Sequence, residues 1–135
     1  MNSFKLITLG LIISISAGCQ VISPLFVDYN GVRRDVAKWI NHQQLLSMQQ
    51  KRSLVQLSKA QQQLYYIDKI PVEQKLALAT QNQIALHCAH QYLSENKINQ
   101  LQELIFGADK KHTILQQYDQ QFPKVKLAAS AIQCE

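Results

Sequence analysis

The chain has 135 residues, of which 47% are hydrophobic and only 17% are charged, so it is long enough and apolar enough to bury one core. Four glycines and three prolines exclude collagen-like chains and proline-rich linkers. The formal net charge is +5, and twenty glutamines supply much of the remaining polarity. The composition therefore predicts one folded, mostly helical domain whose surface is made polar by amides rather than by charges.

Residues 1–18 have the pattern of a secretory signal peptide. Lys5 is the only charged residue before Asp28, and an apolar run follows it over residues 6–15. Small residues then lead up to Cys19, which completes the order of basic, apolar and small segments that such signals share. Residues 6–18 number 13, whereas a membrane-spanning helix needs about 20 apolar residues. The pattern therefore predicts a cleaved signal rather than a transmembrane anchor.

The end of this segment, ISAGC at residues 15–19, resembles the lipobox of bacterial lipoproteins, with Ser16 at the place where the usual motif has leucine. The resemblance implies cleavage after Gly18 and attachment of lipid to Cys19. Each buried methylene of the acyl chains adds about 0.8 kcal/mol to the anchor, so several chains hold it stably. The alternative is an ordinary cleaved signal with an incidental cysteine.

The residue after the cysteine bears on sorting between the two membranes. In Gram-negative lipoproteins, an aspartate at this place typically retains the protein at the inner membrane, and here the residue is Gln20. For a Gram-negative host, the resemblance therefore implies a lipid-anchored protein on the periplasmic face of the outer membrane.

Residues 19–31 are predicted to form a tether, because they contain Pro24 and end in Asn30 and Gly31, a pair typical of turns. A tether of about 12 residues spans at most about 40 Å when fully extended. It therefore keeps the folded part, residues 32–135, close to the membrane.

One long N-terminal helix is predicted over about residues 32–63, where there is no glycine or proline. Apolar side chains and a few glutamines recur there at steps of three and four, which is helical spacing. The members of this stripe are Val36, Ile40, Gln43, Leu46, Gln50, Leu54, Leu57, Gln61 and Leu64. The aromatic residues Trp39, Tyr65 and Tyr66 are expected in the core, although an exposed cluster of them would mark a partner surface.

Three further helices are predicted, giving an all-α bundle of about four helices with one long N-terminal helix. Pro71 begins the second, which has a broad apolar band and runs to Leu93. Ser94 caps the third, which Gly107 ends. Asp109 is expected to cap the fourth, which ends before Pro123. The apolar residues 125–132 then form either a short strand or a last helical turn.

A disulfide between Cys88 and Cys134 is predicted. If Cys19 carries lipid, two of the three cysteines remain, and the periplasm is oxidising. The bond would close a loop of 47 residues, counting both ends. In the chain-entropy model, closing such a loop stabilises the folded state by about 4 kcal/mol. The alternative is a pair of free buried thiols.

The segment from His87 to His90 is the only cluster with a metal-like pattern. The two histidines are three residues apart, so both imidazoles fit one face of a helix. They are weak metal candidates, because zinc needs further ligands and a disulfide-bonded Cys88 is not one. A Cys88 nucleophile paired with His87 is disfavoured, since adjacent residues on a helix point in different directions. The sequence predicts no catalytic residue and no cofactor.

Basic residues occur in small groups, at 33–34, 51–52, 110–111 and 124–126. Such groups attract anionic headgroups or acidic polymers, but a solvated face is the simpler interpretation. Nucleic acid is not expected as a partner for a periplasmic lipoprotein. The glutamine pairs and triplets are short, and they fit a solvated helix face, a glycan or a partner helix.

The predicted function is a non-catalytic interaction or accessory subunit of an envelope complex, with the membrane and an envelope protein as partners. One alternative is a binding module for a small molecule or cell-wall glycan, which would use a groove between helices. The other is a metal-dependent enzyme built on His87 and His90.

Overall fold

The computed structural model describes residues 31–135, so the predictions for Cys19, Gln20 and the signal segment lie outside the described residues. The described part is all-helical and has no strand, which confirms the predicted fold class. It has five α-helices and two short 3₁₀ helices. Their bounds are α1 Arg34–Asn41, α2 Met48–Gln62, η1 Gln63–Lys69, α3 Val72–Tyr92, α4 Glu95–Phe106, α5 Lys111–Gln121 and η2 Ala129–Ala131.

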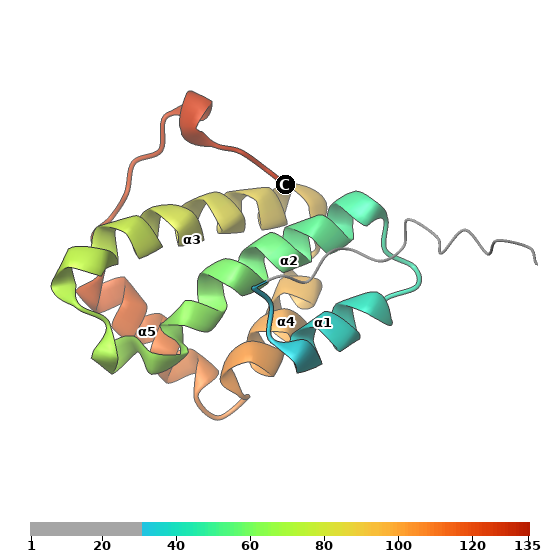
Figure 1. Cartoon of the computed structure of the whole chain (residues 1–135), viewed down its shortest axis with the longest axis horizontal. Coiled ribbons are helices and arrows are strands. Elements are labelled where there is room, and N and C mark those ends of the chain that lie inside the picture. The colour runs from blue at the N-terminus through green and yellow to red at the C-terminus, as the bar shows by residue number, and fades with distance from the viewer. Residues whose placement is uncertain (1–30) are drawn as a thin grey trace, which may run out of the picture.

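Helix α2 lies at the centre of the bundle and packs against α1, α3 and α4 (Figure 1). Helix α3, the longest, runs antiparallel to α2, and α5 packs against η1 and α4. The core is formed by buried side chains from every α-helix and from η1. They include Val36, Ile40, Leu54, Leu57, Leu64, Ala85, Ala89, Ile98, Leu101, Ile105, Phe106 and Ile114.

The single long N-terminal helix is not confirmed, because the chain breaks between α1 and α2. Ser47 caps α2 by accepting a hydrogen bond from the Gln50 backbone N–H, and the Gln50 side chain accepts one in return from the Ser47 N–H. This capping box starts a new helix without any glycine or proline. The break lets α1 fold back against α2 and α4, so the bundle has five helices rather than about four.

The predicted caps of the later helices hold with one exception. Ser94 accepts a hydrogen bond from the Lys97 N–H at the start of α4, and Gly107 ends that helix with a φ of 82°. Pro71 immediately precedes α3. The prediction for Asp109 was wrong: α5 begins after Lys110 and has no side-chain cap, because residues 107–111 continue the turn through backbone bonds.

Some residues expected in the core lie on the surface. Tyr66 is 63% exposed, since a non-helical residue conformation inside η1 turns it outward. Val72 and Leu76 belong to the broad apolar band predicted for the helix after Pro71, but they are 80% and 60% exposed. Trp39 and Tyr65 are partly buried against the core, as expected. Tyr66, Val72 and Leu76 thus lie close together in the sequence around the start of α3.

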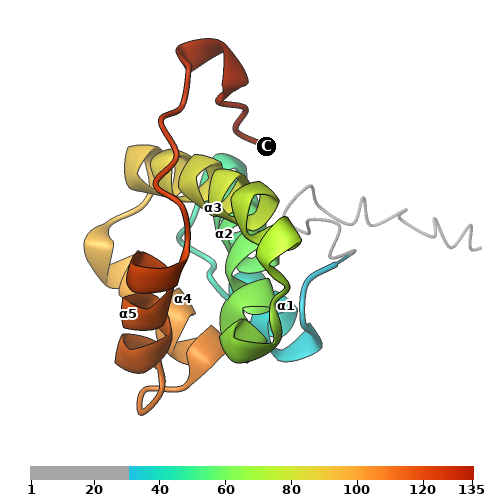
Figure 2. The same ribbon diagram turned by 90° about the vertical axis from the view of Figure 1, so that its left-hand side faces the viewer.

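The C-terminal tail leaves α5 at Phe122 and stands away from α3 as an arch before returning to the bundle (Figures 1 and 2). It contains the helical turn η2, one of the two conformations expected for it. The predicted disulfide is formed: Cys88 on α3 is bonded to Cys134, with 5.5 Å between their Cα atoms. The bond ties the end of the arch to the buried face of α3. Among the helices of residues 31–135, none has the length and hydropathy to cross a membrane.

Candidate functional site

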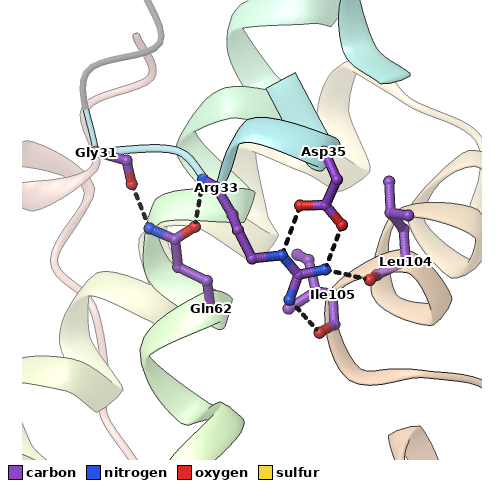
Figure 3. Close-up of polar contacts among 6 residues, drawn as sticks. All are labelled: Gly31, Arg33, Asp35, Gln62, Leu104 and Ile105. Atoms are coloured by element: carbon purple, nitrogen blue, oxygen red, sulfur yellow. Dashed lines mark hydrogen bonds and ion pairs between the residues drawn. The ribbon is translucent and has the colours of Figure 1, made fainter. Parts of the chain in front are cut away.

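The first described residues are fastened to the bundle by Arg33 (Figure 3). Its guanidinium donates a pair of hydrogen bonds to Asp35, at 2.7 and 2.8 Å. The same group donates to the backbone carbonyls of Ile105, at 2.9 Å, and Leu104, at 2.6 Å, at the end of α4. Asp35 therefore holds the guanidinium in the orientation that reaches the last, otherwise unpaired carbonyls of α4.

Gln62 at the end of α2 provides a second contact to the same segment (Figure 3). Its side-chain oxygen accepts a hydrogen bond from the Arg33 backbone N–H at 3.0 Å, and its amide nitrogen donates to the Gly31 carbonyl. One side-chain amide thus pairs with both polar groups of the entering chain. We name the contacts of Arg33, Asp35 and Gln62 the entry clasp.

The charges of the entry clasp reinforce each other. The hydrogen bond with Asp35 is the main cause that raises the pKa of the Arg33 guanidinium, and it lowers the pKa of the Asp35 carboxyl. Both side chains are about half exposed, at 41% and 52%, so solvent screens the attraction between them. The clasp is therefore an orienting device rather than a large source of stability.

A second feature is a row of amides on α2 that holds the end of the chain. Gln49 donates to the Glu135 carbonyl at 2.8 Å. Gln56 donates to the Gln133 carbonyl at 2.8 Å and accepts from the Glu135 N–H at 3.3 Å. Lys59 is paired with the Glu135 carboxylate at 3.4 Å. Apart from Cys134, residues 133–135 are thus held by their main chain and by the Glu135 carboxylate.

Beside this row lies a groove between α2, α3 and the arch, with a volume of about 380 Å³. Its lining residues are Gln56, Lys59, Ala60, Gln63, Gln81, Ile84, Ala131, Gln133 and Glu135. We name it the amide groove. Its volume falls within the range of small-molecule sites, about 300–1,000 Å³, and its walls combine amides with small apolar side chains.

The weak metal candidates do not converge. His87 is exposed on α3, and Nδ1 of His90 lies 2.8 Å from a carboxylate oxygen of Glu95. Cys88 is in the disulfide. Within residues 31–135, no group of three histidine, cysteine or acidic side chains is placed to hold a metal ion.

The small basic groups do not merge into one patch. Lys51 is 2% exposed while the adjacent Arg52 is exposed. Lys111 is paired with Glu103 at 3.2 Å, and Lys124 is paired with Asp119. The positive charge is therefore spread over the surface and partly neutralised by neighbouring acids.

Sequence reasoning did not identify the residues of the entry clasp or the amide groove. The signal for the groove is the spacing of Gln49, Gln56 and Gln63, which are seven residues apart and so lie on one side of α2 and its C-cap. The spacing alone does not predict that the tail binds this face, because the disulfide and the arch bring the tail there.

No protein-family model, curated protein or solved structure matches this chain. Fold and site together define a small all-α, disulfide-linked domain with a clasped N-terminal entry and a groove at its C-terminal arch.

Proposed function

We propose that this chain is a lipid-anchored, non-catalytic docking subunit of an envelope complex, held by Cys19 at the periplasmic face of the outer membrane. The observation that carries the docking role is a group of exposed apolar side chains. Three of the large hydrophobic residues that are exposed in residues 31–135, Tyr66, Val72 and Leu76, fall within one short stretch around the start of α3. Exposed apolar groups of this kind are typical of contact surfaces.

The entry clasp supports the anchoring part of the proposal. Arg33 and Gln62 bond the start of the described chain to α2 and α4. A force applied through the tether is therefore transmitted to both helices rather than to α1 alone. A tether of about 12 residues limits the distance to the membrane to about 40 Å. The subunit would thus present its docking surface within a narrow zone above the lipid.

The lipobox-like residues and the oxidised Cys88–Cys134 pair agree with the same compartment. Disulfides persist in the periplasm and are rare in the cytosol. This support is independent of the docking surface.

The test is the size of the protein's complex in detergent-solubilised envelopes, measured by size-exclusion chromatography after mild crosslinking. Wild type is expected at a size well above that of the purified mature subunit in the same detergent. The double variant Val72→Ser and Leu76→Ser is expected at the size of the free subunit. The control is Leu45→Ser, which removes a fully exposed apolar side chain elsewhere and should leave the complex intact. A wild type that elutes as a single chain contradicts the proposal.

The second candidate is a binding module for a small molecule or a cell-wall glycan. The observation that favours it is the amide groove, whose volume of about 380 Å³ suits a short oligosaccharide. Amides such as those of Gln63 and Gln81 both donate and accept hydrogen bonds, as glycan hydroxyls require. Calorimetric titration with chitotetraose tests it, and binding that Gln81→Ala abolishes would support it.

A further inference from the structure

Three glutamines seven residues apart form a row, two on α2 and the third at its C-cap, and only the first two hydrogen-bond to the tail. Gln49 and Gln56 bond to main-chain atoms of residues 133 and 135. Gln63, seven residues further along, has its hydrogen bonds with Lys59 and Gln81 instead. Gln49 and Gln56 both reach Glu135, so their side chains converge on the end of the tail.

The mode of binding at Gln56 is that of an extended strand edge. Its amide nitrogen donates to the carbonyl of Gln133, and its oxygen accepts from the N–H of Glu135. In an extended chain, the carbonyl of one residue and the N–H two residues later lie on the same edge. Gln56 therefore hydrogen-bonds to two main-chain groups at once, and these bonds do not depend on which side chains the tail carries.

The tail does not continue along this row. Just before residues 133–135 the chain turns through η2, where the Ala131 N–H bonds to the Ala128 carbonyl and the Ile132 N–H bonds to the Ala129 carbonyl. The arch then rises from the bundle, as both views show (Figures 1 and 2). The amide groove is lined both by the tail, at Ala131, Gln133 and Glu135, and by Gln63 and Gln81, which the tail does not hydrogen-bond.

The polar groups in this part of the groove match a main chain. The Gln63 amide nitrogen donates to the Lys59 carbonyl at 3.0 Å and to the Gln81 side-chain oxygen at 3.3 Å. Within residues 31–135, this leaves the Gln63 oxygen and the Gln81 nitrogen without a partner. One is an acceptor for an N–H and the other is a donor for a carbonyl.

We propose that the amide groove binds an extended, uncharged peptide segment of a partner protein through its main chain. The proposal rests on the docking role given above and names the chemistry that one docking site would recognise. The floor, formed by buried Ala60 and half-buried Ile84, suits small apolar side chains. The Lys59–Glu135 pair at 3.4 Å neutralises the rim, so the groove selects for no charge.

The probe is a capped tetrapeptide with the sequence of residues 131–134, with serine in place of cysteine. It is titrated into the ¹⁵N-labelled mature chain carrying Cys19→Ser, with the disulfide intact. The side-chain amide signals of Gln63 and Gln81 are expected to shift and saturate. Gln63→Ala is expected to weaken binding about tenfold, and the control Gln116→Ala, an exposed amide on α5, should leave it unchanged.

Three outcomes overturn the proposal. The first is that neither amide signal moves at about 5 mM peptide, which excludes even weak binding. The second is that a peptide N-methylated on its main chain binds equally well. The third is that chitotetraose shifts these signals while the peptide does not. Because the probe experiment needs no lipid, its failure is distinct from a failure of anchoring or of the Val72 and Leu76 surface.

Discussion

Loss of the disulfide at its more exposed end should destabilise the whole domain. We choose Cys134→Ser, because Cys134 is half-buried whereas Cys88 is fully buried, and a change at Cys88 would disturb the core as well. The bond closes a loop of 47 residues, so the chain-entropy relation gives an upper value of about 4 kcal/mol. The freed tail also gains mobility in the native state, which reduces the net loss to about 2–4 kcal/mol.

Thermal unfolding followed by circular dichroism measures this effect. For a domain of this size, each kcal/mol shifts the Tm by about 4–8 °C, so a drop of at least about 8 °C is expected. Reduced wild type should match the variant, and Cys19→Ser should match oxidised wild type. Limited proteolysis should cut residues 123–133 in Cys134→Ser first, since the arch then has one attachment. Equal Tm values for oxidised wild type and Cys134→Ser would refute the reasoning.

Three further predictions follow from particular side chains. Asn82 is 1% exposed, and neither polar atom of its amide has a partner in the described residues. Urea unfolding should therefore show that Asn82→Leu stabilises the domain by about 1–2 kcal/mol. The control Gln83→Leu, at an exposed position, should not stabilise it. Because the folded pKa of Asp35 is lowered, its stabilising contribution is present above the unfolded pKa of about 3.9 and is lost as the pH falls through the folded value. Urea unfolding should therefore find Asp35→Asn less stable by up to about 1 kcal/mol at pH 7 and equal to wild type at low pH, and a difference that persists at low pH would contradict the clasp. Gln20→Asp should move the protein to the inner-membrane fraction in density gradients, and wild type already found there would show that the sorting inference is wrong.

The helices that the sequence predicts best are those with local signals at their ends. Ser94 and Gly107 bound α4 as expected, since a cap and a positive φ act within one turn of the chain. The break between α1 and α2 was missed, because its signal is the Ser47 and Gln50 capping box inside a continuous helical pattern. Hydrophobic periodicity runs through that break, so periodicity alone does not place it.

The disulfide was predictable from cysteine number and compartment, but the groove beside it was not. Gln56 and Gln63 look alike in the sequence, and both are expected to be solvated. Only the path of the tail distinguishes them, since residues 133 and 135 hydrogen-bond to Gln56 and not to Gln63. The entry clasp is equally non-local, because Arg33 meets carbonyls of α4 that are 71 and 72 residues away in the chain.

The intact mass of the protein extracted from membranes tests the central claim of a lipid-anchored subunit most directly. We expect a chain that begins at Cys19, carries a diacylglyceryl group and a further acyl chain, and has two hydrogens fewer than the reduced form because Cys88 and Cys134 are bonded. In Cys19→Ala the lipid mass should be absent. An unmodified mature chain, or one that begins at another residue, would contradict the claim.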